Sequence, residues 1–329
     1  MNLRLSIVVP CYNEEAVLGE TLRRLSGLLQ GLIDTHQASD DSELLFVDDG
    51  SRDRTWALID EASRRYILVR GLKLSRNRGH QYAVLAGLMN ARGDATISVD
   101  ADLQDDLNAI PEMIKAHAAG AEVVYGVRKQ RTTDTFFKRF TAEGYYRLLA
   151  RLGVEIVFNH ADYRLLGRRA VEALREYREV NLFLRGVIPQ LGFMTATVYY
   201  DRAERFAGES KYPIGKMLAL AWQGVTSFST MPLRLITGLG ALISFFSIGI
   251  SLWALWVRFF SNTAVPGWAS TVLPIYLLGG IQLLCIGVIG EYLAKTYIET
   301  KRRPLFHIES DTSTVDTDTS NSKSRQTHP

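Results

Sequence analysis

Two aspartates, Asp100 and Asp102, stand two positions apart directly after the apolar stretch 95–99, and Gln104 follows them. Side chains alternate along a strand, so both carboxylates can face the same way if the strand geometry persists. Carboxylate and amide oxygens are hard ligands of the kind that Mg²⁺ and Mn²⁺ take. We therefore expect a divalent metal here, bridging the phosphates of a nucleotide and stabilising a leaving diphosphate, with Asp102 as a catalytic residue. A plain acidic turn is the alternative.

Two further polar motifs follow expected strands. Residues 10–14 read Pro-Cys-Tyr-Asn-Glu, and residues 48–51 read Asp-Asp-Gly-Ser. Asp49 can accept hydrogen bonds from a base or a ribose, although Asp-Gly is also a simple turn signal. The chain carries neither the glycine triplet of a dinucleotide fold nor a Walker-type phosphate loop. Phosphates must therefore be held by a metal and by cationic side chains.

Basic side chains gather further along the chain. A compact polar cluster consists of Arg202, Arg205, Ser210 and Lys211. Arginine forks and a lysine suit a phosphate headgroup at a membrane surface, although the same charges can simply attract anionic lipid. Arg128 and Arg139 can complete such a phosphate site from the other side.

Asp162 lies in the mixed stretch 159–165, and its carboxylate can face the same crevice. It can act as a general base, or it can make a structural hydrogen bond to Arg164 or to the backbone. His80 and His160 are isolated in the sequence, so we expect surface histidines and no zinc site.

These side chains must be positioned by an α/β sheet. Apolar runs alternate with helix-period segments over the first 126 residues, which indicates a mainly parallel, Rossmann-like sheet with helices on both faces. In such a sheet the loops at the carboxyl ends of the strands form the ligand crevice, and the three polar motifs lie there. The expected strands are 5–9, 43–47, 67–74, 95–99, 122–126 and 196–200, and the expected helices are 14–29, 55–65, 81–91 and 110–118.

Two long apolar runs, 235–257 and 272–289, follow this region. Runs of this length can cross a hydrocarbon core of about 30 Å, so we expect a two-helix transmembrane hairpin. Its outer ends carry the basic excess, which places both ends in the cytoplasm. A pair of buried core helices is the alternative. Residues 211–231 look amphipathic and can lie in the membrane surface.

Composition bounds the remaining possibilities. A formal charge of +3 over 329 residues gives no argument for nucleic acid. Cys11 and Cys285 are unsuited to a disulfide and fit a reducing cytosol. The chain from residue 310 is rich in Ser, Thr and Asp, so we expect disorder from there. The expected domains are a cytoplasmic catalytic domain (1–210), a membrane-interface segment (211–232), two transmembrane helices (233–294) and a cytoplasmic tail (295–329).

Taken together, the motifs resemble those of the polyprenyl-phosphate glycosyltransferases. These are inverting, family-two enzymes with the GT-A fold, and they include dolichyl-phosphate mannose synthase and the bacterial bactoprenol glucosyltransferases. The resemblance runs to about residue 306. The segments that carry it read VVPCYNE, DDGS, DADLQD, ADYRLL and RFAGESKY.

The resemblance implies roles for the matching residues. Asp162 matches the proposed catalytic aspartate, and His80 departs from the commoner family wording, so the sugar cannot be carried over. Arg128 matches, less closely, a basic residue at the acceptor phosphate. The implied nucleotide-sugar contacts are Pro10, Tyr12, Glu14, Asp49, Asp100 and Gln104. The implied metal ligands are Asp100, Asp102 and Gln104, and the acceptor-phosphate segment contains Arg205, Ser210 and Lys211.

The expected reaction is metal-dependent, inverting transfer of one hexose from a nucleotide sugar to undecaprenyl or another polyprenyl phosphate. The product would be a lipid-linked sugar donor for cell-envelope glycosylation. UDP-glucose is the favoured donor, and N-acetylglucosamine, mannose and aminoarabinose donors stay open. We expect a multi-pass protein of the inner (cytoplasmic) membrane that can self-associate through its hairpin. A non-catalytic nucleotide-sugar sensor is the alternative of another class, and a processive synthase is disfavoured because its Gln-x-x-Arg-Trp motif is missing.

Overall fold

The computed structural model describes residues 3–128, 160–177, 179, 184–201, 231–260 and 268–313. The chain divides into two compact units. The first comprises residues 1–140, 156–211 and 303–329, and the second comprises residues 141–155 and 212–302.

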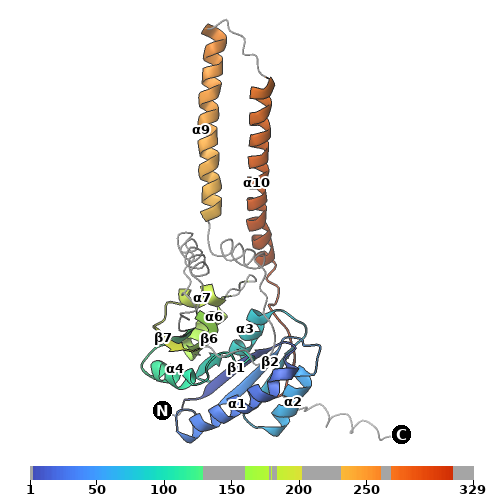
Figure 1. The fold of residues 1–329 in the computed structure, drawn as a ribbon, viewed down its shortest axis with the longest axis vertical. Coiled ribbons are helices and arrows are strands. Elements are labelled where there is room, and N and C mark those ends of the chain that lie inside the picture. Colours follow the sequence, from blue (N-terminus) through green and yellow to red (C-terminus); the bar gives the residue numbers. More distant parts are fainter. Residues whose placement is uncertain are drawn as a thin grey trace, which may run out of the picture. The chain divides into compact units, whose positions relative to one another are not determined.

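The first unit is built on an eight-stranded sheet with the order β7-β5-β6-β4-β1-β2-β3-β8. Figure 1 labels β1, β2, β6 and β7 of this sheet. Parallel pairs join β1 to β2 and β4, β2 to β3, and β5 to β7. Antiparallel pairs join β6 to β4 and β5, and β8 to β3. The expected mainly parallel sheet is therefore confirmed. The strands are β1 Leu5–Cys11, β2 Glu43–Asp48, β3 Val69–Leu74, β4 Ala95–Ser98, β5 Val123–Arg128, β6 His160–Gly167, β7 Thr195–Tyr200 and β8 Ile308–Asp311.

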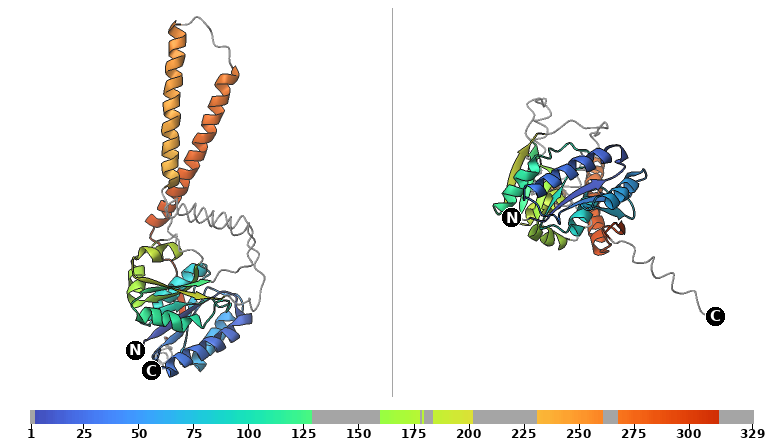
Figure 2. Two further views of the ribbon diagram at one scale, coloured as in Figure 1. Left: turned by 60° about the vertical axis from the view of Figure 1, so that its left-hand side comes forward. Right: turned by 90° about the horizontal axis from the view of Figure 1, so that it is seen from below.

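Helices cover both faces of the sheet because the central strands are apolar on both sides. Every residue of β1 and β2 is buried, as continuous apolar runs in a parallel sheet require. The main core joins α1, α2 and α4 to one face, and a smaller core joins α3 to the other. Figures 1 and 2 show these helices lying over the sheet. The helices are α1 Glu15–Asp34, α2 Thr55–Arg65, α3 His80–Asn90, α4 Ala109–Ala118, α6 Arg168–Arg175 and α7 Leu184–Gln190.

Each expected strand and helix of this unit has an observed counterpart, with ends shifted by a few residues. The sequence pattern did not reveal β6, α6, α7 or β8. The β6 strand alternates polar and apolar residues from His160 to Leu165, but two of its polar positions are the charged residues Asp162 and Arg164, which pair with each other.

The second unit contains two long helices, α9 (Met231–Phe260) and α10 (Trp268–Thr300). The two apolar runs of the sequence lie within them. Among the described residues, one stretch, Ile281–Thr300, is long and apolar enough to be a candidate membrane span. The structure therefore supports one candidate span where two were expected. Of the expected amphipathic segment, residues 211–230 lie outside the described part of the chain.

The strand β8, Ile308–Asp311, belongs to the first unit and extends its sheet. The expected disorder from about residue 310 is wrong at its start, because β8 runs to Asp311 and pairs antiparallel with β3. Arg70 fixes the strand through two hydrogen bonds to Asp311, from Nε at 2.9 Å and from Nη2 at 2.6 Å. Lys73 Nζ also lies 2.8 Å from Glu309 Oε1. Polar residues can thus form an edge strand when ion pairs anchor them.

Candidate active site

The loops that follow β1 and β2 are joined by hydrogen bonds. The backbone N–H of Asn13 donates to Ser51 Oγ at 2.9 Å, and that of Arg52 donates to Asn13 Oδ1 at 2.9 Å. The N–H of Glu14 donates to Thr55 Oγ1 at 2.8 Å. The register pairs Cys11 with Asp48, so the two strands end side by side. The structure therefore brings these two sequence motifs together at one edge.

The residues predicted to contact the nucleotide differ in exposure. Pro10 is buried within β1, where it pairs with Val47. Tyr12 is 41% exposed, and Glu14 is half-buried at the start of α1. An exposed tyrosine next to a buried strand end offers a ring on which a base can stack.

Asp49 holds the loop that precedes α3. Its two carboxylate oxygens accept hydrogen bonds from the backbone N–H groups of Arg78 (2.7 Å) and Gly79 (2.8 Å). Burial raises the pKa of Asp49, against the effect of these two bonds, which lower it. Gly50 has φ +68°, and a Cβ there would lie 2.6 Å from the backbone nitrogen of Asn77. Only glycine therefore fits between the two loops.

Residues 99–105 form the acidic loop, which begins earlier in the chain than expected. β4 ends at Ser98, and residues 101 and 102 form a turn, so the two-residue period of a strand does not orient Asp100 and Asp102. Leu103 has φ +54°, and Asp102 Oδ1 accepts a hydrogen bond from the N–H of Gln104 at 3.2 Å. A left-handed residue between two candidate ligands is the kind of strained backbone that functional loops carry.

Negative charge is concentrated around Asp100. Burial raises its pKa to about 6; His80 opposes this, and the carboxylates of Asp105, Asp162 and Asp102 add to it. A nearby cation would stabilise the ionised form of this carboxylate. Within the described ranges, no group of three or more His, Cys, Asp or Glu side chains is arranged to hold a metal. Mg²⁺ is commonly bound by one or two carboxylates together with substrate phosphates, so the hard oxygens of this loop fit a site that the substrate completes.

Arg128 binds side chains on the neighbouring loop and strand. Its Nε donates to Tyr200 Oη at 3.1 Å, and its Nη2 lies 3.3 Å from Asp105 Oδ1. Tyr200 Oη donates to the same carboxylate. Asp105 is 3% exposed, and within the part of the chain that the structure describes its Oδ2 has no hydrogen-bond partner. This network ties the acidic loop to the end of β7, directly before the predicted acceptor segment.

Asp162 is the centre of a cluster of charged side chains. Arg164 hydrogen-bonds to its Oδ1, and Arg185 on α7 makes two further contacts, from Nε to Oδ1 at 3.2 Å and from Nη2 to Oδ2 at 3.1 Å. His80 Nε2 lies 3.5 Å from Asp162 Oδ2 and 3.5 Å from Asp100 Oδ1. Burial alone would raise the pKa of Asp162, but His80 and the two arginines outweigh it and hold the pKa well below its usual range.

His80 is a surface residue as expected, with a side chain that is 44% exposed, but it is not isolated. The residue begins α3 at the same sheet edge as the acidic loop, and its imidazole links two carboxylates of the cluster. Arg185 was missed because it belongs to a short helix that the sequence pattern did not reveal. A strand-end position could have indicated His80, since the loop after β3 must reach this edge.

Part of the predicted site lies outside the described part of the chain. This applies to Arg139, Arg202, Arg205, Ser210 and Lys211. Their role at an acceptor phosphate stays a prediction.

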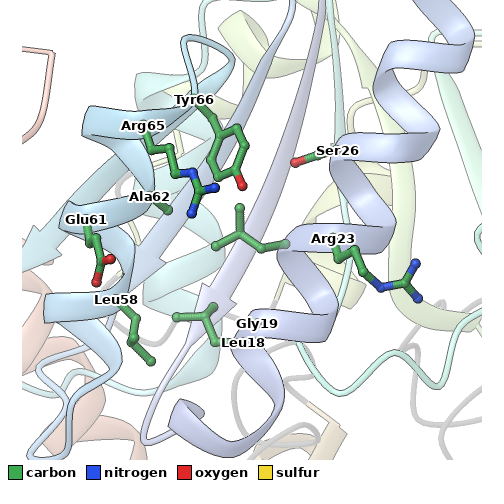
Figure 3. Close-up of a pocket in the computed structure, with 10 residues that line it drawn as sticks. Leu18, Gly19, Arg23, Ser26, Leu58, Glu61, Ala62, Arg65 and Tyr66 are labelled. Carbon is green, nitrogen blue, oxygen red and sulfur yellow. The ribbon is translucent and has the colours of Figure 1, made fainter.

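A separate pocket lies between α1 and α2 (Figure 3). Its volume is about 410 Å³, and no predicted site residue lines it. Apolar side chains such as Leu18 and Leu58 form part of its wall, and Arg23, Glu61 and Arg65 also line it. The pocket belongs to the helical layer and is distinct from the carboxyl edge of the sheet.

Comparison with known proteins adds a second kind of observation. The family model described as glycosyl transferase family 2 matches residues 6–175. The uncharacterized glycosyltransferase YkoT of Bacillus subtilis is 51% identical over 309 residues, covering 93% of this chain and 91% of that protein. The bactoprenol glucosyl transferase of Shigella phage SfV is 38% identical over 313 residues, covering 94% of this chain and 99% of that protein.

Solved structures are more remote. Glucosyl-3-phosphoglycerate synthase from Mycobacterium tuberculosis, crystallised with Mn²⁺, UDP and glucosyl-3-phosphoglycerate, is 18% identical. The match covers 68% of this chain and 78% of that one, with a TM-score of 0.43.

Proposed function

This chain belongs to glycosyl transferase family 2, and from that premise we propose that it transfers one hexose from a nucleotide sugar to a polyprenyl phosphate. The family expected from the motifs is thereby confirmed, and the enzyme is a glycosyltransferase. The donor and acceptor that we favour are UDP-glucose and undecaprenyl phosphate. The main support is the 38% identity to a bactoprenol glucosyl transferase across 94% of the chain.

The geometry of the sheet edge supports the same reaction. Three strand-end loops meet there. Their acidic residues lie near Asp162, whose carboxylate is kept ionised by Arg164 and Arg185. The exposed ring of Tyr12 and the buried carboxylate of Asp49 suit a base and a ribose. Each oxygen of Asp49 keeps a second lone pair that can accept a hydrogen bond from a ribose hydroxyl. The nucleotide would therefore lie over the ends of β1 and β2, with its phosphates toward the acidic loop.

The acceptor phosphate is the nucleophile. A phosphate monoester has a second pKa of about 6, so near neutral pH it is largely dianionic and needs no base. Its oxygen would attack the anomeric carbon opposite the leaving diphosphate, and one displacement inverts that carbon. The burden on the protein is to align two anionic substrates that repel each other.

Asp162 suits a positioning role better than a proton-accepting one. Its pKa lies well below the usual range because His80, Arg164 and Arg185 outweigh the effect of burial. A carboxylate so stabilised is a poor base, but it is a fixed acceptor for hydroxyl groups of a sugar. We assign it to the orientation of the donor sugar.

A divalent cation fits the acidic loop. Asp100, Asp102 and the side-chain oxygen of Gln104 would hold Mg²⁺ or Mn²⁺, and the loop's surplus of negative charge favours a cation there. When bound, the ion would stabilise negative charge on the departing diphosphate. The expected acceptor cluster from Arg202 to Lys211 would neutralise the lipid phosphate in a similar way.

The membrane part of the proposal follows from the acceptor. Ile281–Thr300 is the candidate span, and we propose that α9 crosses as well, giving a hairpin with the catalytic domain on the cytoplasmic side of the inner membrane. The basic residues after residue 294 support that orientation. A polyprenyl phosphate anchored in the same bilayer would then present its headgroup to the catalytic domain.

One assay tests the reaction. Membranes that contain the protein are incubated with undecaprenyl phosphate and, separately, with labelled UDP-glucose, UDP-N-acetylglucosamine, GDP-mannose and an aminoarabinose donor. We expect glucose label to move into the lipid fraction. Transfer from another donor would replace glucose but keep the reaction. No transfer from any donor, with nucleotide still bound, would favour the non-catalytic sensor.

A substitution tests the metal assignment. Loss of a residue that only supports a metal ligand typically lowers activity about 10–100-fold. Asp102 is a proposed ligand itself, so Asp102→Ala should reduce metal-dependent turnover by more than that. Asp60→Ala is the matched control, because Asp60 pairs with Arg64 on the surface of α2. Near wild-type activity in Asp102→Ala would refute the metal site.

For the acceptor, Arg205→Ala should raise the KM for lipid more than the KM for nucleotide sugar.

A further inference from the structure

Arg164 and Arg185 contact the same carboxylate but differ in their surroundings. Arg164 lies on β6 two residues after Asp162, so both side chains point to the same face of the sheet. The Arg164 side chain is 1% exposed, and its Nε and Nη1 are buried with no hydrogen-bond partner among the described residues. The Arg185 side chain is 39% exposed. Arg164 therefore already supplies a buried counter-charge to Asp162, and charge balance alone does not require Arg185.

The contact from Arg185 orients the carboxylate. Its Nε lies 3.2 Å from Asp162 Oδ1 and its Nη2 lies 3.1 Å from Oδ2, so the planar fork grips both oxygens. A two-point contact of this kind fixes direction as well as charge. It leaves Asp162 Oδ2 facing His80 Nε2, 3.5 Å away, and that imidazole also faces Asp100 Oδ1. A continuous line of polar contacts thus leads from Arg185 to the acidic loop.

The helix that carries Arg185 is itself anchored to the same edge. The N–H of Leu184 donates to Gln81 Oε1 at 3.1 Å, and Gln81 follows His80 at the start of α3. Leu184, Val187 and Ile188 are buried, so α7 is packed in place. The position of Arg185 is therefore set by the element that also places His80.

We propose that Arg185 is a positioning residue for sugar transfer: it acts through Asp162, whose carboxylate it holds toward His80 and the acidic loop. The inference rests on the proposed function and adds to it a residue that the sequence motifs do not contain. Without the fork, Asp162 keeps its charge and its partner Arg164 but loses a defined direction. The sugar would then bind and react in a less suitable orientation.

Steady-state kinetics of the full-length protein in membranes test the proposal. In the same assay, sugar transfer by the wild type tests the proposed function separately. Arg185→Gln should lower kcat by up to about 100-fold, with the donor KM changed less than kcat. Arg185→Lys should recover only a small part of the loss, because a lysine restores the charge but not the fork. Arg169→Gln is the matched control, since that guanidinium is 76% exposed and lies 3.7 Å from Glu122. The control should behave as the wild type.

A double-mutant cycle separates action through Asp162 from a general structural role. If Arg185 acts through Asp162, the double variant Asp162→Asn/Arg185→Gln should lose no more activity than Asp162→Asn alone. Losses that multiply would overturn the proposal, and so would a wild-type kcat in Arg185→Gln while the wild type transfers sugar. If Arg185→Gln does not fold, Arg185→Lys carries the test, and a wild-type kcat in that variant overturns the role of the fork.

Discussion

Asp49 and Asp162 are both aspartates at the carboxyl edge of one sheet, and both are largely buried, yet different groups hold them. Neutral backbone N–H groups of Arg78 and Gly79 bind Asp49. The charged side chains of Arg164 and Arg185 bind Asp162. Burial raises the pKa of Asp49 in spite of its hydrogen bonds, whereas the cations around Asp162 overcome burial and lower its pKa.

The difference teaches what each carboxylate can do. Asp49 organises a neighbouring loop and remains able to accept a further hydrogen bond, as its proposed contact with a ribose requires. Asp162 joins β6 to α7 and, through His80, to α3, so it is part of a framework that spans several elements. The same residue type therefore has a local function in one place and a connecting function in the other, because the partners differ in charge and in origin.

The largest effect should follow removal of the carboxylate of Asp162. Asp162→Ala leaves the guanidinium of Arg164 buried without a counter-charge, so the variant should lose about 3–5 kcal/mol of stability. Denaturant unfolding of the full chain in detergent, followed by circular dichroism, measures the loss. The double variant Asp162→Ala/Arg164→Met should recover part of it. An Asp162→Ala protein as stable as the wild type would show that Arg164 does not depend on this partner.

A smaller effect is expected at Asp49. Asp49→Asn places an NH₂ group where an oxygen now accepts from Arg78 or Gly79, and one buried N–H then lacks a partner, at a cost of about 1–3 kcal/mol. The same unfolding experiment measures it, and equilibrium binding of UDP should weaken because the loop loses its anchor. Asp60→Asn, a carboxylate-to-amide change at a surface pair with Arg64 on α2, is the matched control. If Asp49→Asn lost more stability than Asp162→Ala, the comparison between the two carboxylates would be reversed.

Of the three aspartates, Asp311 should show the smallest effect, because it binds an arginine as Asp162 does but is more exposed. Burial raises its pKa, and Arg70 and Ser313 outweigh this and lower it to about 2. A lowered pKa means that the folded state binds the proton more weakly than the unfolded state does. Its stabilising contribution is therefore present above the usual value of about 3.9 and is lost as the pH falls toward 2.

Asp311→Asn should accordingly cost about 1 kcal/mol at neutral pH, since solvent screens a partly exposed pair. The difference between the variant and the wild type should shrink as the pH is lowered from 4 to 2 in a series of unfolding experiments. Glu309→Gln, at the more exposed pair with Lys73, should cost still less. A difference that grew on acidification would contradict the sign of the pKa shift.

The core of the fold could be predicted from the sequence, whereas the antiparallel additions could not. Runs such as 43–47 are apolar throughout, which is a local property that already indicates a strand buried on both faces. The β6 strand carries Asp162 and Arg164 in its interior, and these become acceptable only when they pair with each other. The β8 strand is polar, and it pairs with a strand more than 230 residues earlier in the chain.

The site divides in the same way. Residue types and spacing alone determined that Asp49, Asp100 and Asp102 would stand at the carboxyl edge, because in a parallel sheet every strand end reaches that edge. Only the tertiary structure decided that His80 and Arg185 would reach Asp162, because those contacts depend on which helices pack on which face of the sheet. The order of residues in the sequence therefore determines which acidic side chains lie at the site. Which cationic side chains bind them depends on how the helices pack on the sheet.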